Sequence, residues 1–254
     1  MIGPVLFTLG GVDISPLGAM IMLGALSGAW WVSVNFGRLG IDRSYALTFF
    51  SWLMLAGAVG AKLWGAAEAW AAGEVSDFAS VLVSRSGAGV FGGLLVGLAA
   101  SLTRCKYDGI SVREVKRAVA APFALGHAIA RIGCFLVGDD YGPPSSLPWA
   151  MSFPKGILPT MVRVHPTQLY ESAWMFACAL WLSHRFHRSP FLFAEYLVLM
   201  GTGRFLLEFV RVGPKPIETL SAAQVIAIVC VVGGVIMLKV FGEKPTARVA
   251  TRVS

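Results

Sequence analysis

Long apolar stretches divide this chain, and short polar connections separate them. The seven stretches cover residues 15–36, 45–72, 88–103, 117–137, 167–184, 191–210 and 219–241. A helix needs about 20 residues to cross the hydrocarbon core of a bilayer, where the backbone must satisfy its own hydrogen bonds. Charged residues make up only 14% of the chain. The sequence therefore predicts an all-α integral membrane protein, with about seven transmembrane helices in a single domain over residues 1–254.

Basic residues are concentrated in alternate connections between these stretches. Thirteen of the 21 lysines and arginines lie there, at residues 38–43, 104–117, 185–188 and 239–252. The other connections hold five, which are Arg85, Lys155, Arg163, Arg211 and Lys215. By the positive-inside rule we expect the N-terminus outside and a C-terminal tail, about residues 242–254, in the cytoplasm. The net charge of +7 follows from this distribution and does not indicate nucleic-acid binding.

The longest polar connection, about residues 138–166, is predicted to lie on the outer side. Its repeated prolines fix φ and remove hydrogen-bond donors, so we expect an irregular and fairly rigid loop over the outer leaflet. In the third stretch, glycines recur every four residues at Gly89, Gly93 and Gly97. This spacing favours close packing against a neighbouring helix.

Two arginines lie inside predicted membrane spans, Arg131 in the fourth and Arg204 in the sixth. An arginine at bilayer depth costs roughly 3 kcal/mol on insertion scales, so its presence requires a compensating role. A guanidinium group presents paired planar donors that suit phosphate oxygens. The two arginines predict a cavity that receives an anion, such as a lipid phosphate. The alternative is that Arg131 reaches the outer surface or pairs structurally with Asp139 or Asp140.

Other reactive side chains lie close to Arg131 in the sequence. His127, Arg131 and Cys134 stand at i, i+4 and i+7, which places them on one helix face within about 10 Å. His127 and Asp139 are the candidate proton acceptors. Cys134 is either a small buried side chain or a thiol activated by Arg131. The spacing of the possible zinc ligands matches no compact motif, so we expect no metal; they are His127, Cys134, Asp139, Asp140 and His165.

The sixth stretch repeats this spacing with Arg204, Glu208 and Arg211. One interpretation is an ion-pair ladder within a single helix, which makes the charges tolerable in lipid. We assign the Glu208–Arg211 pair mainly to that role. Arg204 lies deeper in the stretch and is the better catalytic candidate.

Residues 163–171 open the fifth stretch and have two interpretations. In the first, Thr167 caps the helix and Tyr170 lies at the membrane interface. In the second, a lipid head group at the outer interface contacts His165, Gln168 and Glu171.

These segments resemble the prolipoprotein diacylglyceryl transferase family. The resemblance covers most of the chain and is strongest in Arg131–Gly142, Leu147–Pro154, His165–Glu171 and Gly203–Arg211. It implies a seven-helix enzyme of the bacterial inner membrane with its N-terminus outside. Such an enzyme transfers the diacylglyceryl group of phosphatidylglycerol to the lipobox cysteine of a prolipoprotein and releases glycerol 1-phosphate. We expect no cofactor.

The resemblance also assigns roles to residues. Arg131 and Arg204 match the family's two essential arginines, and Gly142 matches its motif glycine. The candidate catalytic residues are Arg131, Arg204, His127 and Asp139. The candidate substrate-binding residues are Gly142, His165, Gln168, Tyr170, Glu171, Glu208, Arg211 and Cys134.

The chain departs from the family pattern at several positions. Typical members carry His-Gly-Gly at Phe91-Gly92-Gly93, asparagine at Cys134, glutamate at Asp139 and tyrosine at Met200. We expect His127 to replace the missing histidine. Two alternatives accompany the leading interpretation: transfer to a different acceptor by the same fold, or a non-catalytic phospholipid-binding membrane protein. A purely structural membrane protein fits least, because it has little use for intramembrane arginines.

Overall fold

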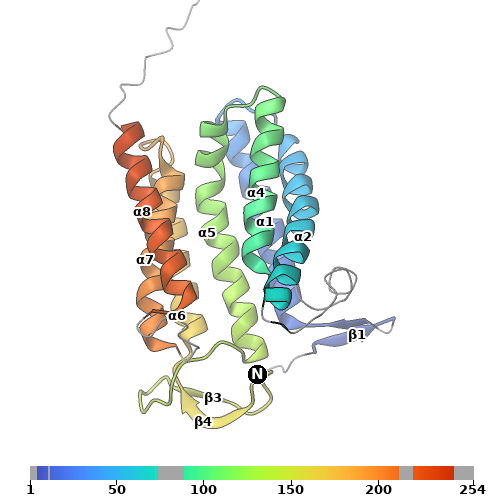
Figure 1. The fold of residues 1–254 in the computed structure, drawn as a ribbon, viewed down its shortest axis with the longest axis vertical. Helices are drawn as coiled ribbons and strands as arrows, with labels where there is room; N and C mark the ends of the chain where they lie inside the picture. The colour runs from blue at the N-terminus through green and yellow to red at the C-terminus, as the bar shows by residue number, and fades with distance from the viewer. Residues whose placement is uncertain (1–4, 11, 72, 74–88, 212–219, 243–254) are drawn as a thin grey trace, which may run out of the picture. The chain divides into compact units, whose positions relative to one another are not determined.

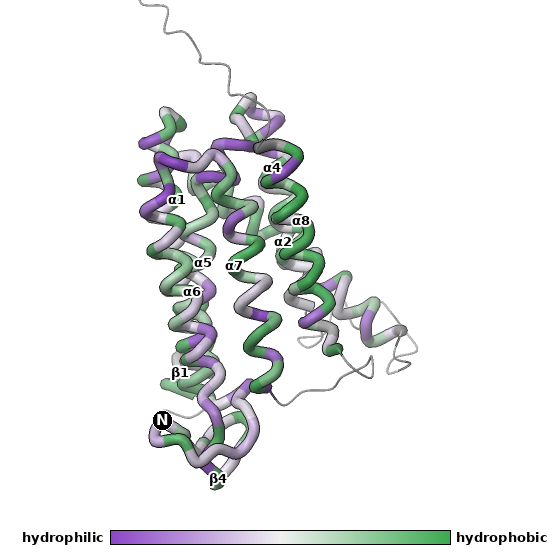
Figure 2. Tube along the Cα trace, turned by 90° about the vertical axis from the view of Figure 1, so that its left-hand side faces the viewer, coloured by the Kyte–Doolittle hydropathy of each residue, from purple (hydrophilic) through white to green (hydrophobic). Residues whose placement is uncertain are grey.

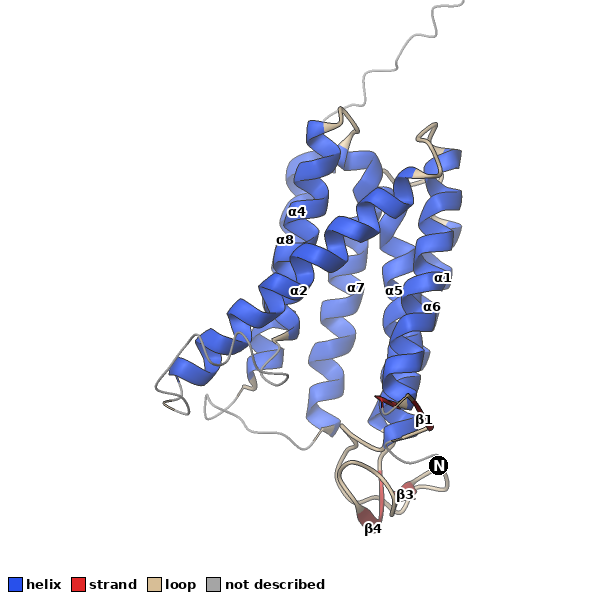
Figure 3. Ribbon diagram, turned by 90° about the vertical axis from the view of Figure 1, so that its right-hand side faces the viewer, coloured by secondary structure: helices blue, strands red, loops and turns tan. Residues whose placement is uncertain are grey.

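The computed structural model of this chain describes residues 5–10, 12–71, 73, 89–211 and 220–242. Within them, long helices account for most of the chain (Figure 3). They are α1 (Pro16–Arg38), α2 (Tyr45–Ala71), α4 (Val90–Tyr107), α5 (Val112–Val137), α6 (Thr167–His184), α7 (Leu192–Leu207) and α8 (Ala222–Gly242). A 3₁₀ turn, η1 (Glu208–Val210), follows α7. Arg85, Lys215 and the predicted tail beyond residue 242 lie outside the described residues.

Each described helix falls on one predicted apolar stretch, and most ends agree within three residues. The largest differences are at α4, which continues to Tyr107, and at α5, which already begins at Val112. Both extensions run through lysines and arginines, which are good helix formers and can extend into water at a helix end.

Four of the described helices, α1, α2, α5 and α8, are long and apolar enough to cross a membrane by length and composition. The most apolar is α8, with a mean hydropathy of 2.4 over Ala223–Val240, and its tube in Figure 2 is green almost throughout. In contrast, α7 has 16 residues, or about 24 Å of rise, and purple hydrophilic positions interrupt its tube (Figure 2). The prediction of a mostly helical membrane protein is therefore confirmed.

The chain forms two compact units, and residues 29–118 make up one of them. There α2 and α4 pack closely along glycines. A Cβ atom at Gly93 would lie 3.1 Å from the carbonyl oxygen of Gly57, and one at Gly97 would lie 2.5 Å from that of Leu53. Larger side chains would force the two helices apart. The predicted role of the glycine repeat in close helix packing is therefore confirmed.

A proline inside α5 has a compensating partner. Pro122 has no N–H to donate to the carbonyl oxygen of Ala118, four residues earlier. That oxygen instead accepts a 2.9 Å hydrogen bond from the side-chain amide of Asn35 in α1. Asn35 is only 1% exposed, so this bond satisfies two buried polar groups together.

The second unit comprises residues 1–28 and 119–254. In it, Trp174 of α6 donates its indole N–H to the carbonyl oxygen of Leu199 in α7 at 3.0 Å. The indole also covers Gly203, which leaves no room for a Cβ atom there. This contact packs the middle of α6 against α7, and it brings the polar residues at the start of α6 close to the end of α7.

The connection between α5 and α6 contains a short antiparallel hairpin, β3 (Met151–Phe153) and β4 (Thr160–Val164). Figure 1 shows it beyond the ends of α5 and α6. Phe153 is fully buried and stacks on Tyr141 with ring centroids 5.4 Å apart. The expectation of a wholly irregular loop is wrong, because this aromatic core supports a local sheet. A second hairpin, β1 (Phe7–Leu9) and β2 (Val12–Ile14), precedes α1.

Candidate functional site

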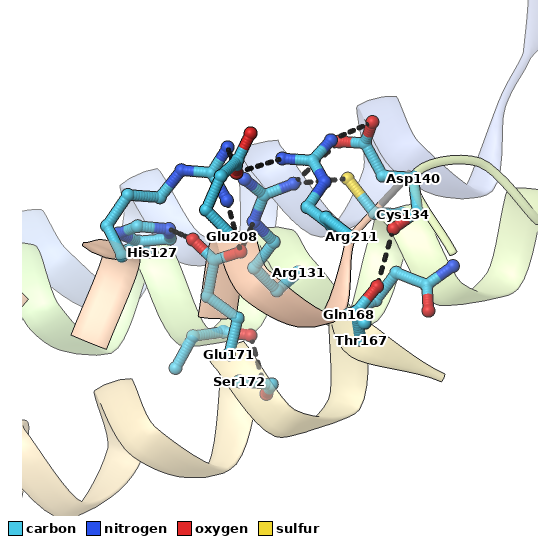
Figure 4. A network of polar contacts seen from close by, with 12 residues as sticks. His127, Arg131, Cys134, Asp140, Thr167, Gln168, Glu171, Ser172, Glu208 and Arg211 are labelled. Atoms are coloured by element: carbon cyan, nitrogen blue, oxygen red, sulfur yellow. Dashed lines mark hydrogen bonds and ion pairs between the residues drawn. The ribbon is translucent and has the colours of Figure 1, made fainter. Parts of the chain in front are cut away.

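Charged side chains from three helices meet where α5 ends, α6 begins and α7 ends (Figure 4). α5 contributes His127, Arg131 and Cys134, and α6 contributes Glu171. The third set comes from α7 and the turn that follows it, namely Arg204, Glu208 and Arg211. All lie in the unit formed by residues 1–28 and 119–254.

The predicted face of α5 is present in the structure. Arg131 Nη1 lies 3.6 Å from Cys134 Sγ. His127 and Arg131 both contact the same carboxylate, that of Glu171 on α6. The i, i+4, i+7 spacing therefore places all three side chains toward one polar cluster.

Glu171 is the central carboxylate of this cluster. Its side chain is only 6% exposed. Oε2 forms an ion pair with Arg131 Nε at 3.0 Å and lies 3.9 Å from Arg204 Nη1, while Oε1 lies 3.0 Å from His127 Nε2. An ionised carboxylate can only accept hydrogen bonds, so the neutral imidazole donates from Nε2 and keeps its lone pair on Nδ1. Glu171 thus orients His127 while neutralising Arg131.

Arg204 has an unused donor in this cluster. Its Nη2 pairs with Glu208 at 2.8 Å, one helical turn further along. Its Nη1 is buried and has no hydrogen-bond partner among the described residues. Because a buried guanidinium N–H without a partner is costly, this atom indicates a position for an incoming acceptor.

Both ion pairs of the predicted ladder, Arg204–Glu208 and Glu208–Arg211, are present, but the last residue lies beyond the helix. α7 ends at Leu207, and Arg211 follows the 3₁₀ turn with an extended backbone. Arg211 Nη1 therefore lies 3.9 Å from Glu208, whereas its Nη2 makes a closer ion pair with Asp140. The tighter winding of the turn removes Arg211 from the α-helical register.

Of the two adjacent aspartates, Asp140 makes the contacts with the arginines. Its Oδ2 accepts from Arg131 Nη1 at 3.0 Å, and its Oδ1 pairs with Arg211. Asp139 makes no such ion pair in the described part of the chain, and its Oδ1 is buried without a hydrogen-bond partner. Burial raises the pKa of the Asp139 carboxyl, and the Asp140 carboxylate raises it further. From the sequence, Asp140 was expected as a possible structural partner of Arg131 or a conceivable zinc ligand, and not as a substrate-binding residue.

The start of α6 holds the backbone of these aspartates. Thr167 Oγ1 donates to the carbonyl oxygen of Asp140 at 2.7 Å, and Gln168 Nε2 donates to that of Asp139. Thr167 therefore does not cap its own helix, which begins without a side-chain cap at Pro166. Gln168 is 1% exposed, so its amide positions the loop from inside.

His165 and Tyr170 belong to a separate chain of hydrogen bonds. Trp149 donates its indole N–H to the Tyr170 hydroxyl at 2.7 Å, and that hydroxyl lies 3.2 Å from His165 Nδ1. Since the hydroxyl accepts from the indole, it can donate its own hydrogen to Nδ1. This chain ties the loop to the first turns of α6.

Gly142 lies where three segments converge. Its N–H donates to the carbonyl oxygen of His165 at 2.9 Å. An added Cβ atom would come within 2.9 Å of both His165 Cβ and Thr167 Cγ2, and it would clash with the carbonyl oxygen of Val210. A glycine is therefore required here by the close approach of neighbouring backbone.

We expect Gly142→Ala to lower the melting temperature and the activity together. Overpacking of this kind costs about 1–3 kcal/mol and would displace the loop that carries Asp140. Thermal unfolding in detergent checks the stability. Gly233→Ala is the matched control, since a Cβ atom at Gly233 meets nothing within 4 Å. An unchanged melting temperature in Gly142→Ala would contradict the close packing.

A metal is not needed to explain the acidic residues of the loop. Cys134 Sγ and carboxylate oxygens of Asp139 and Asp140 lie within 4.8 Å of one another. However, Arg131 contacts both Cys134 and Asp140, and Arg211 pairs with Asp140 as well. Two guanidinium groups already supply the positive charge that a cation would bring.

Comparisons with known proteins found one matching family and several relatives. A model of the family described as prolipoprotein diacylglyceryl transferase matches residues 4–240. The phosphatidylglycerol–prolipoprotein diacylglyceryl transferase of Clostridium tetani (strain Massachusetts / E88) is 30% identical over 243 residues, covering 93% of this chain and 97% of the relative. The protein of the same name from Finegoldia magna is 29% identical, covering 92% and 93%. That of Thermosynechococcus vestitus is 28% identical, covering 89% and 88%.

Proposed function

Because this chain belongs to the prolipoprotein diacylglyceryl transferase family, we propose that it transfers the diacylglyceryl group of phosphatidylglycerol to the lipobox cysteine of a prolipoprotein. Glycerol 1-phosphate is the second product. The family is one of bacterial membrane enzymes, and its activity is a transferase activity. The observation that carries the proposal for this chain is the convergence of three arginines with one buried, unused donor on Arg204.

Arg131 and Arg204 are the proposed ligands of the lipid phosphate. Both are held by Glu171, which fixes their guanidinium groups before the lipid arrives. The Arg204 Nη1 hydrogen then finds an acceptor in a phosphate oxygen. Negative charge increases on that phosphate as the bond to the glyceryl carbon breaks, and fixed cations in a water-poor site stabilise such a change strongly.

His127 is the proposed base. Its Nδ1 lone pair takes the proton of the acceptor thiol, while Nε2 stays hydrogen-bonded to Glu171. The thiolate attacks the glyceryl carbon, a C–S bond forms and the C–O bond to phosphate breaks. The electron pair of that bond leaves with glycerol 1-phosphate, whose phosphate is bound by Arg131 and Arg204. Asp139 is the alternative base, because its raised pKa makes it a better proton acceptor than an ordinary carboxylate.

We further propose that all seven described helices cross the membrane as one domain. The last turns of α1, α4 and α8 contain lysine or arginine and that of α6 contains His184, whereas those of α2 and α5 contain no basic residue. The last turn of α7 contains Arg204, which is part of the arginine cluster. This alternation supports a cytoplasmic side at the ends of α1, α4, α6 and α8. The N-terminus and residues 138–166, with the arginine cluster beside them, would then lie on the outer side.

The experiment is an incubation of the purified protein with labelled phosphatidylglycerol and a lipobox peptide. Release of glycerol phosphate with labelling of the peptide is the expected result. Release without peptide labelling would indicate a different acceptor. Absence of turnover, with lipid still bound, would indicate a non-catalytic phospholipid-binding protein.

Cys134 suggests one specific alternative acceptor, since its thiol lies 3.6 Å from Arg131 Nη1. We expect only packing from it, so Cys134→Ser should keep most of the activity. Intact-protein mass spectrometry after incubation with lipid alone checks this directly. A diacylglyceryl adduct mapped to Cys134, together with an inactive Cys134→Ser variant, would identify a covalent intermediate instead. Cys178→Ser, on α6, is the control for the loss of a thiol in a membrane helix.

A further inference from the structure

The carboxylate of Asp140 lies between two of the site's arginines. Its Oδ2 accepts a hydrogen bond from Arg131 Nη1 at 3.0 Å, and its Oδ1 is paired with Arg211 Nη2. Figure 4 shows both guanidinium groups beside this carboxylate. Paired guanidinium donors bind a carboxylate and a phosphate in the same manner. Asp140 therefore fills a place that suits a phosphate.

Asp140 differs from the other carboxylates of the cluster in its access to water. Its side chain is 40% exposed, whereas those of Glu171 and Glu208 are 6% and 9% exposed. A partly hydrated carboxylate loses little when its ion pair opens, but a buried charge that loses its partner is strongly destabilising. Of these three carboxylates, Asp140 therefore requires the least free energy to separate from its arginine partners.

The backbone of Asp140 is fixed although its side chain is accessible. Its φ is +57°, in the left-handed region that aspartate and asparagine tolerate better than most residues. Its carbonyl oxygen is bound by Thr167, and that of Asp139 is bound by Gln168. The carboxylate can therefore leave the arginines by side-chain rotation, without movement of the loop.

The charge balance of the cluster favours replacement of the Asp140 carboxylate by a phosphodiester over binding of a phosphodiester in addition to it. The guanidinium groups of the cluster belong to Arg131, Arg204 and Arg211, and the ion-paired carboxylates belong to Glu171, Glu208 and Asp140. These charges cancel. A phosphodiester carries a single negative charge, as a carboxylate does. If it entered while Asp140 stayed in place, the buried cluster would carry an uncompensated charge, which is costly.

We propose that Asp140 is a displaceable internal anion, which the phosphodiester of phosphatidylglycerol replaces between Arg131 and Arg211 while another of its oxygens accepts from Arg204 Nη1. This inference rests on the proposed function and deepens it. On binding, the carboxylate rotates into water. After transfer it returns to the arginines and competes with the bound glycerol phosphate, which speeds product release. Asp140 thereby sets both the affinity for an anionic lipid and the rate at which glycerol phosphate leaves the site.

The test is Asp140→Asn, which keeps the size and the left-handed backbone but removes the competing charge. Binding of labelled phosphatidylglycerol in detergent micelles, without acceptor peptide, should tighten by about tenfold, equivalent to about 1.4 kcal/mol. With acceptor peptide, both KM for the lipid and kcat should fall, and inhibition by glycerol 1-phosphate should strengthen. A residue with a merely structural role would not lower KM.

Two further variants make the result specific. Asp140→Glu restores a carboxylate and should return binding and kcat toward wild type. Asp108→Asn removes an aspartate that also pairs with an arginine, Arg104, and it should leave lipid binding unchanged. Unchanged or weaker lipid binding in a folded Asp140→Asn protein, beside an active wild type, would overturn this inference alone. A wild type that neither binds nor turns over phosphatidylglycerol would overturn the proposed function with it.

Discussion

Arg204→Ala should lower turnover by about 100-fold or more, which corresponds to roughly 3 kcal/mol of lost transition-state stabilisation. The variant loses the buried Nη1 donor proposed for the phosphate, and it leaves Glu208 without its 2.8 Å partner. Arg204→Lys should recover little, because an ammonium group cannot supply the same paired planar donors. Glycerol phosphate release, measured at matched protein levels, checks both variants.

The chain offers a close control for this change. Arg104 pairs with Asp108 at 2.8 Å and an i, i+4 spacing, as Arg204 pairs with Glu208. Arg104→Ala therefore removes an equivalent helical ion pair without touching the proposed phosphate ligands, and it should keep near-normal activity.

Arg131→Ala should be as inactive as Arg204→Ala, since its guanidinium contacts both Glu171 and Asp140. Near-wild-type turnover in Arg204→Ala would refute the phosphate role.

The sequence was most informative where a single periodicity determines the structure. An apolar stretch of membrane length has few options other than a helix, and a helix fixes which residues share a face. The seven helix positions and the convergence of His127, Arg131 and Cys134 could therefore be predicted. The glycine repeat of α4 was predictable for the same reason, because the spacing of four residues follows the helix.

Contacts made by loops could not be predicted in this way. The sequence left open whether Asp139 or Asp140 pairs with Arg131. In the structure it is Asp140, whose backbone is left-handed, that contacts the arginines. The sixth stretch was predicted to run to residue 210, three residues beyond the end of α7, since nothing in its apolar pattern marks the change to a 3₁₀ turn. The β3–β4 hairpin depends on the stacking of Tyr141 on Phe153, which lies outside any local pattern.

His127→Gln should lower turnover by about 100-fold or more, the range expected for loss of a general base. The glutamine keeps a polar side chain that can still contact Glu171, but it cannot take a proton from the acceptor thiol. In the wild type, protonation of the imidazole removes the Nδ1 lone pair, so activity should fall as the pH is lowered. The variant should lack this acid limb of the pH–rate profile.

Two further variants distinguish His127 as the base from a structural role of His127 and from Asp139 as the base. His184→Gln changes a histidine at the other end of α6, where it contacts Arg188, and it should leave the profile unchanged. Asp139→Asn should retain the acid limb if His127 is the base, because the imidazole is still present. If Asp139→Asn instead abolishes turnover while His127→Gln keeps the wild-type rate and pH profile, the proton goes to Asp139. In that case the contact between His127 and Glu171 would serve to hold α5 against α6.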